Sequence, residues 1–598
     1  MKRFQLLVLV SAIAAGAIWY SFYRSRHTSS AAVASLLPKE TLILLHLPDF
    51  NRSRAELHKT DLYQLWEEPA VKDFLQKPRA KIPSDAAIGP TVDEIASLEM
   101  KDAFIALVAV ENSAWRTVGG FRFKGDGADA EKLVTRWRGK LVGTGSDVKH
   151  ESVEYQGRQI QTDSAGIVNL ATVRAGQWYF FANSVEQLKP LLDRADGRVK
   201  DQATALSSDD VFRAASQRMP GTYAALAFAR VDQLVEKLMP AAEQGSSDLM
   251  ARIRQIRSFC GATSFDGGKI RDTFFVGMPK LAETGNLSRM SLPIATKETF
   301  LYAASVLNLT KEMDLSGPSL TSSWMGGLQS ITSAVSAKGI TLEEWKSAFG
   351  AEFSLVGDWP ATSRMPSLFA TLPVKDAARA NKILLTLAAD KADEIDWIHE
   401  ERNGVHYFST ASSGRMFSFS PTIALSDRIL IAGMDADSVE AAMKRSAVGN
   451  SELAGSKNFQ NAERALPAAQ QAFAYLDLAL IYTRLDAVLR PMLFMSAAFL
   501  PGIADTVDLN KLPAAEVIAK HLGPIVMSQR YDADGYVAES IGPVTLYQTI
   551  LGVGAISGAT TMFYQHKLPG TPRTPSSSTP APLATPAGLP SPSPADSP

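Results

Sequence analysis

The side chains best suited to chemistry are the histidines, of which the chain has eight. The densest local group runs from His399 to Glu401 and resumes at His406. Its spacing differs from HExxH, in which two histidines one helical turn apart hold a zinc ion. Asn403-Gly404, which separates the two histidines, is the strongest short signal for a β-hairpin. We interpret the group as an exposed polar hairpin, with metal binding as the alternative, and expect no metal site and no cofactor.

The residues that could act as nucleophiles lack their usual partners. His46 precedes Pro48-Asp49, but no G-x-S-x-G motif supplies a positioned serine. The single cysteine, Cys260, lies in an apolar stretch and is predicted to be a small buried hydrophobic residue. We therefore predict no catalytic residue. Carboxylate pairs for glycoside chemistry stay open, because they need no proximity in sequence.

One apolar segment, residues 492–500, suggests contact with another molecule. It reads Met-Leu-Phe-Met-Ser-Ala-Ala-Phe-Leu and is apolar around nearly its whole circumference if it is helical. Such a helix is either buried or meets lipid or a partner, and Met and Phe make adaptable surfaces. Burial within or between domains is the alternative. The candidate hydrophobic contact surface consists of Met492, Phe494, Met495, Phe499 and Leu500.

Length and charge limit the class of protein. With 598 residues, the chain is longer than one hydrophobic core usually covers, so two or more domains are expected. Lys and Arg number 61, and Asp and Glu number 62, which gives a net charge of -1. Since no strong positive field would attract phosphate groups, we expect no nucleic acid partner.

Residues 1–30 are predicted to hold a transmembrane anchor. The stretch from Phe4 to Phe22 contains no charged residue, and Trp19 lies where an interfacial aromatic belt forms. A cleaved signal peptide is the alternative, because Ala32-Val33-Ala34 has the form of a cleavage site. That motif lies beyond two arginines, so we favour an uncleaved anchor in the bacterial inner membrane, with the main body in the periplasm.

The C-terminal part contains a second apolar segment at residues 541–567. Gly554 and Gly558 are four residues apart, a spacing that lets helices approach closely in lipid, but several threonines dilute the signal. A second transmembrane helix and a final strand followed by a loosely packed helix both stay open. Residues 568–598 are rich in Pro, Ser and Thr and are predicted to form a disordered tail.

Between these ends, several sequence patterns occur twice in the same order, about 250 residues apart. Two of them read as hairpins closed at Gly157 and Gly404. Others pair a strand with a following helix. The matched segments begin at Lys39 and Lys297, Ala103 and Glu352, Glu154 and Glu401, Ser184 and Ser438, and Thr222 and Ala472. We interpret this order as one unit present twice in tandem.

The predicted fold class is α+β. Strands joined by glycine turns imply antiparallel sheets, and the helices between them are expected to pack on one face of each sheet. The predicted domains after the anchor are a first copy at 36–280 and a second copy at 294–540, followed by the apolar segment and the tail. The stretch from Pro279 to Pro293 reads as the linker. The two copies could pack sheet beside sheet about a pseudo-twofold axis.

Three motifs near the start of the folded part carry a family resemblance. They are Leu37-Pro38-x-Glu40-Thr41, Leu45-His46-Leu47-Pro48-Asp49 and Asp61-Leu-Tyr-Gln-Leu-Trp66. These motifs resemble a group of uncharacterised bacterial proteins that carry a domain-of-unknown-function label, over roughly residues 30–545. The resemblance implies a single membrane anchor and a large duplicated ectodomain in the cell envelope. Because the motifs are structural, no functional residue is carried over.

The sequence thus predicts a non-catalytic, membrane-anchored envelope protein with a binding or scaffolding role. The expected partners are the membrane, through the N-terminal helix, and a protein or a lipid. A carrier of lipid or another hydrophobic ligand is the first alternative. A cryptic hydrolase is the second.

Overall fold

The structure, a computed structural model, describes eleven stretches of the chain. They are residues 31–80, 92–111, 114–142, 148–166, 168–238, 254–280, 286–306, 337–389, 396–410, 420–499 and 508–549. One compact unit spans Met1–Tyr547 and another spans Gln548–Pro598. The predicted anchor at 1–30 and the tail at 568–598 lie outside the described residues. Within the described stretches, no helix combines the length and the apolar character needed to cross a bilayer.

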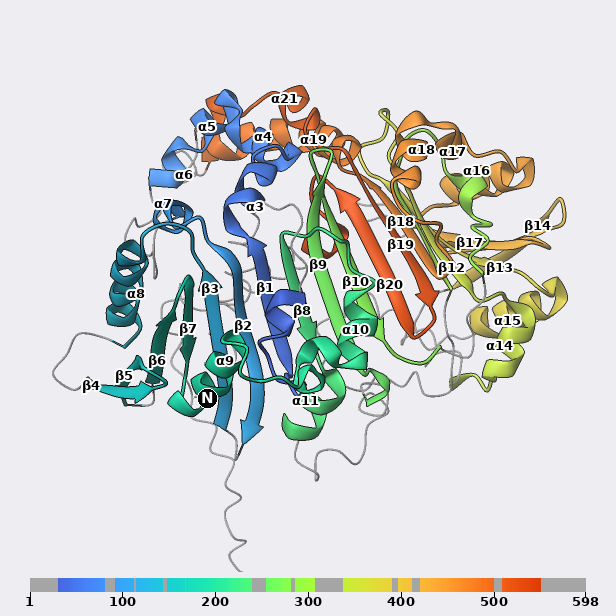
Figure 1. The fold of residues 1–598 in the computed structure, drawn as a ribbon. Helices are drawn as coiled ribbons and strands as arrows, with labels where there is room; N and C mark the ends of the chain where they lie inside the picture. Colours follow the sequence, from blue (N-terminus) through green and yellow to red (C-terminus); the bar gives the residue numbers. More distant parts are fainter. Residues whose placement is uncertain are drawn as a thin grey trace, which may run out of the picture. The chain divides into compact units, whose positions relative to one another are not determined.

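A large antiparallel sheet forms the body of the first unit (Figure 1). In its N-terminal half the strands pair in the order β4-β5-β6-β7-β3-β2-β1-β8-β9-β10. The bounds are β1 (Ile43–Asp49), β2 (Lys101–Glu111), β3 (Ala114–Arg122), β4 (Lys149–Tyr155), β5 (Arg158–Ala165), β6 (Val168–Ala175), β7 (Trp178–Ala182), β8 (Ala225–Ala229), β9 (Ser258–Asp266) and β10 (Lys269–Gly277).

The C-terminal half has the same order of neighbours, β14-β15-β16-β17-β13-β12-β11-β18-β19-β20. The bounds are β11 (Thr299–Val306), β12 (Glu352–Asp358), β13 (Ser367–Pro373), β14 (Trp397–Arg402), β15 (Val405–Thr410), β16 (Thr422–Leu425), β17 (Ile429–Gly433), β18 (Ala472–Asp477), β19 (Pro524–Asp532) and β20 (Gly535–Gly542). Each strand of one half therefore corresponds in order to a strand of the other.

Strands β10 and β20 join the two halves edge to edge, and we call this pairing the seam. It runs antiparallel from Ile270 opposite Gly542 to Gly277 opposite Gly535. Near its middle, the Glu539 carboxylate accepts hydrogen bonds from Arg271 at 3.2 Å and from Arg530 at 2.8 Å. The seam thus combines backbone pairing with a half-buried charge network.

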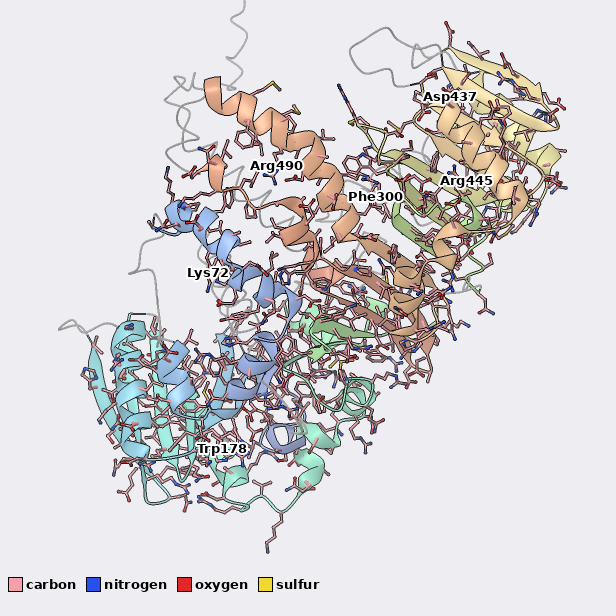
Figure 2. All side chains as sticks on the ribbon, turned by 90° about the horizontal axis from the view of Figure 1, so that it is seen from above. Lys72, Trp178, Phe300, Asp437, Arg445 and Arg490 are labelled. Atoms are coloured by element: carbon pink, nitrogen blue, oxygen red, sulfur yellow. The ribbon has the colours of Figure 1, made fainter. Side chains whose placement is uncertain are left out.

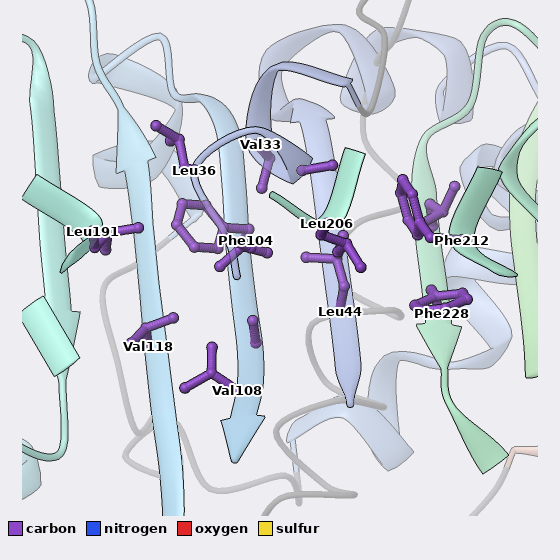
Figure 3. Close-up of a cluster of buried hydrophobic side chains, with 14 of the residues drawn as sticks. Val33, Leu36, Leu44, Phe104, Val108, Val118, Leu191, Leu206, Phe212 and Phe228 are labelled. Atoms are coloured by element: carbon purple, nitrogen blue, oxygen red, sulfur yellow. The ribbon is translucent and has the colours of Figure 1, made fainter. Parts of the chain in front are cut away.

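Helices cover both faces of the N-terminal half. Helices α2 (Ala31–Ala34), α9 (Val185–Ala195) and α10 (Asp210–Ser216) bury apolar side chains in one core, which includes Phe180 of β7 (Figure 3). Helix α8 (Gly127–Val142), which follows β3, buries Leu133 and Val134 in another core together with Tyr179. Tyr179 and Phe180 are neighbours on β7, and successive strand side chains point to opposite faces. The two cores therefore lie on opposite faces of the sheet.

The C-terminal half is covered in the same way. Helices α16 (Ala436–Val448), α17 (Glu452–Gly455) and α18 (Lys457–Arg464) share a core with Ile431, whereas α14 (Leu342–Ala348) and α15 (Ala377–Ala388) share one with Leu430. The prediction of helices on one face only was wrong. Strands such as β7 and β17 are continuous apolar runs, which is typical of strands buried on both sides.

The remaining helices connect or cap the strands. They are α3 (Phe50–Leu57), α4 (Asp61–Glu67), α5 (Pro69–Phe74), α6 (Gln76–Ala80), α7 (Val92–Ser97), α11 (Val231–Leu238), α19 (Leu478–Phe499) and α21 (Ala515–Ala519), with short 3-10 turns η2 (Gln202–Thr204), η3 (Leu206–Ser208), η4 (Leu292–Ile294) and η5 (Leu509–Lys511).

The predicted C-terminal apolar segment begins inside the fold. Gly542 ends β20, and the next residues fold back onto β10. Thr545 is fully buried and donates a hydrogen bond to the Asp272 carboxylate at 2.5 Å, while Tyr547 lies edge-on to Phe274. Residues 550–567, which would form most of a second transmembrane helix, lie outside the described residues.

The buried carboxyl group of Asp272 should make the free energy of unfolding depend on pH. Burial raises the pKa of its carboxyl group, and the hydroxyls of Thr263 and Thr545 lower the pKa by a smaller amount. Since the folded-state pKa lies above the unfolded value, stability falls as pH rises from the unfolded pKa, and the loss is complete above the folded pKa. We expect Asp272→Asn to gain stability relative to the native chain as pH rises from about 4, the ordinary carboxyl pKa, to about 8. Urea unfolding at the two pH values measures this gain, and an equal difference at both would contradict it.

Candidate interaction surface

Helix α19 is the longest helix within the described stretches. It follows β18 and has 22 residues. Asp477 starts the helix by accepting a hydrogen bond from the backbone N–H of Leu480 at 2.9 Å, as an N-terminal cap does. The rest of its sequence is rich in Leu, Ala and Met, which favour helix. The cap and the helix-favouring composition together explain a long helix after β18.

The distal part of α19 exposes large apolar side chains. The side chains of Leu485, Leu489, Met492, Leu493, Phe494 and Met495 are between 38% and 61% exposed. We call these six residues the α19 apolar face. Leu485, Leu489, Met492 and Leu493 follow the spacing that places residues on one side of a helix. Such a cluster is larger than the single apolar residues usually scattered over a protein surface.

Arginines hold the helix to the body of the protein. Arg484 donates to the carbonyl oxygen of Trp359 at 3.0 Å and to Glu298 at 2.9 Å. Arg490 donates to Asp486 and to the carbonyl oxygen of Pro513, at 2.7 Å and 2.6 Å. The hydrogen bond with Asp486 is the main cause that raises the pKa of Arg490. The polar side chains thus fix the orientation of α19 while its apolar ones remain exposed.

Helices α4 and α5 from the N-terminal half lie beside this part of the C-terminal half (Figure 1). Asp73 of α5 pairs with Lys511 at 2.7 Å, and Glu68 pairs with Lys520 at 2.6 Å. Hydrogen bonds from Lys520 and His521 lower the pKa of Glu68. Figure 2 shows the same region from above, with labels on Arg490 of α19 and Lys72 of α5.

Of the five predicted contact residues, the structure describes the side chains of three. Met492, Phe494 and Met495 are exposed, so the alternative of core burial does not hold for them. Phe499 is the last residue of α19, and its side chain is outside the described set. Leu500 lies outside the described residues. Sequence reasoning missed Leu485 and Leu489, although their spacing from Met492 is the helical signal that could have found them.

His46 lies in a buried polar network. Its Nδ1 is 3.0 Å from the Tyr223 hydroxyl and its Nε2 is 3.8 Å from an Asp102 oxygen, while Arg122 donates to the other Asp102 oxygen at 2.5 Å. His46 is fully buried and Asp102 nearly so. The four side chains come from β1, β2, β3 and the segment before β8, so the network ties these strands together. Cys260 is buried as predicted, and burial raises the pKa of its thiol.

The histidines of the predicted polar hairpin come together on β14 and β15. His399 Nε2 lies 3.3 Å from His406 Nδ1. His399 is exposed on β14, whereas His406 is half-buried on β15. No group of three or more His, Cys, Asp or Glu side chains that could hold a metal occurs within the described stretches.

Comparisons with known proteins give little. No protein-family model matches the chain, and no curated protein matches it. Two solved structures, crystal forms III and I of TP0453, are similar to part of the chain. They are 7% and 8% identical, cover 41% of this chain and 80% and 79% of TP0453, and have TM-scores of 0.20 and 0.19.

Proposed function

We propose that the chain is a non-catalytic, membrane-anchored envelope protein, and that the α19 apolar face docks an apolar helix of a protein partner. The observation that carries the proposal is the cluster of six large apolar side chains exposed on one helix. Four of them follow helical spacing, which suits packing against a second helix. Met492 and Met495 add adaptable contacts.

The charges around α19 favour a protein partner over a membrane surface. They are of both signs and mostly paired with one another, as in the polar rim of a protein interface. A helix that lies on lipid instead carries mainly Lys and Arg on its polar face. These charged side chains include Glu68, Asp73, Glu298, Arg484, Asp486, Arg490, Lys511 and Lys520.

Photo-crosslinking in native membranes tests the docking proposal. We expect a photoreactive residue at Phe494 to form one discrete protein adduct. Placed at Val448, which is 78% exposed on α16, it should form none. Because exposed apolar residues at the centre of an interface contribute most of its affinity, Met492→Glu with Met495→Glu should weaken the adduct-forming interaction by about 100-fold.

Matched measurements separate a lost interface from a lost fold. Both methionines are exposed, so the double substitution should change the free energy of unfolding by no more than about 0.5 kcal/mol. A lipid adduct at Phe494 would favour the carrier alternative and overturn the docking proposal. An adduct that survives the double substitution, or equal adducts at Phe494 and Val448, would also overturn it.

We also infer that the two halves are tandem copies of one unit. The identical order of strand neighbours supports this inference. So do the capped helices that follow β7 and β17, where Ser184 and Asp435 each accept a backbone N–H. In the seam, Thr273 faces Glu539, and each is the fifth residue of its strand, as expected where a pseudo-twofold axis passes.

A further inference from the structure

The hairpin of β14 and β15 places two histidines and one glutamate on one face. Glu401 lies directly opposite His406, and His399 lies opposite Phe408. Since alternate residues of a strand share a face, His399, Glu401 and His406 all project to the same side. The turn that fixes this register is Asn403-Gly404, with φ of 53° and 74°.

The distance between the two histidine nitrogens suits the binding of one metal ion. Nitrogen ligands bind zinc at about 2.0–2.1 Å, so two of them in a tetrahedral shell lie about 3.3–3.4 Å apart. His399 Nε2 and His406 Nδ1 are 3.3 Å apart. The rings are inclined by 28°, with centroids separated by 5.4 Å. The same separation allows a hydrogen bond between the two rings, so a shared ion would take the place of that bond.

A buried aromatic ring holds one of the ligands in place. His399 stacks on Phe408 at 4.6 Å between centroids and 22° between planes, and Phe408 is almost fully buried. Side chains fixed by packing lose less entropy on binding than free ones. The Glu401 carboxylate lies 3.8 Å from His406 Nδ1 and adds negative charge beside the pair.

The N-terminal half provides the contrasting case. At the corresponding positions of its β4–β5 hairpin, Ser152 donates a hydrogen bond to Gln159 at 2.7 Å. A cross-strand polar pair is therefore sufficient to stabilise the hairpin, and histidines are not required there. Both hairpins close at residues with positive φ, so their registers are comparable.

We propose that His399 and His406 form a two-ligand surface site for a divalent transition metal ion of the zinc, nickel or copper class. Imidazole suits these ions, and affinity rises toward copper in the usual order. Water completes the coordination shell, and Glu401 contributes charge. Protons compete with the metal, because a protonated imidazole has no free lone pair.

Metal titration of the full chain in detergent tests the site. With Zn²⁺ or Cu²⁺ as the probe, calorimetry should detect one more bound ion in the native chain than in a His399→Ser, His406→Gln double variant. That variant reproduces the pair found at Ser152 and Gln159 and leaves the other six histidines as the shared background. Either single substitution should weaken binding at the site at least about tenfold.

A gain-of-site variant provides the opposite test. Ser152→His with Gln159→His should add one ion to the stoichiometry of the native chain, because it copies the histidine pair onto the matching hairpin. Acidification should release the ions in both cases. Equal stoichiometry for the native chain and the His399→Ser, His406→Gln variant, with unfolding unchanged, would overturn the proposal.

Discussion

Replacement of Glu352 by Ala should destabilise the protein by about 4 kcal/mol, because it removes a buried carboxylate that accepts several part-buried hydrogen bonds. Glu352 is 6% exposed at the start of β12. Its carboxylate accepts hydrogen bonds from the backbone N–H groups of Ser288, Arg289 and Met290 at 2.7, 2.9 and 3.0 Å, and from the Ser288 hydroxyl at 2.7 Å. Arg289 has a positive φ of 54°, which shows how tightly the segment wraps the carboxylate.

Chemical denaturation and amide hydrogen exchange measure the effect of Glu352→Ala. Exchange should accelerate at Ser288, Arg289 and Met290 before the rest of the sheet is affected. Glu352→Gln should cost less, since the amide oxygen still accepts part of the donor set. Glu154→Ala, at an exposed position of β4, should change the free energy of unfolding by no more than about 0.5 kcal/mol. Equal losses for Ala at 352 and at 154 would rule out this role of the carboxylate.

Two features of this fold, the hairpin turns and the burial of Cys260, could be predicted because they depend on residues close together in the sequence. The hairpins at Gly157 and Gly404 were predicted from turn residues alone, and both are confirmed by paired strands that meet at positive φ. Turn chemistry of this kind depends on neighbouring residues only. Burial of Cys260 is likewise confirmed, because its residue type and apolar neighbours already favour the interior.

Identical residues in the two halves indicated corresponding positions less reliably than a shared structural role did. The sequence comparison set Ser184 beside Ser438, because Val and Glu follow both. In the structure, the helix caps are Ser184 and Asp435, so the corresponding position lies three residues before Ser438. Ser and Asp perform the same function there, since each accepts a backbone N–H. The correspondence between Ser184 and Asp435 becomes visible only from the pairing of β7 and β17 with strands far along the chain.

The candidate surface could be predicted in part. The apolar circumference of residues 492–500 indicated contact or burial, and the pattern alone could not separate the two. The choice depends on what packs against α19, which is decided by residues far along the chain such as Trp359 and Glu298. The Glu352 network was beyond prediction for the same reason, since its donors lie 62 to 64 residues away in sequence.

Replacement of Gly535 by Ala should weaken the seam between the two halves by about 3 kcal/mol, the cost of forcing a methyl group into closely packed atoms. A Cβ at this position would lie 2.2 Å from the Val276 carbonyl oxygen and 2.7 Å from the Phe275 ring. The carbonyl belongs to the backbone of β10, so it cannot move aside without separating β10 from β20. Urea unfolding should show a lower midpoint, and exchange should accelerate along both strands.

Two other glycines provide control positions for the Gly535 prediction. At Gly277, directly opposite in the seam, a Cβ would meet the Ser258 hydroxyl at 2.5 Å, and that side chain can rotate away. At Gly221 nothing lies within 4 Å, so Ala there should be neutral or stabilise by up to about 1 kcal/mol through the unfolded state. The expected order of destabilisation is therefore Gly535, then Gly277, then Gly221. A Gly535→Ala protein as stable as Gly221→Ala would mean that β10 and β20 are not packed as closely as the seam requires, and the edge-to-edge joining of the two halves would lose its support.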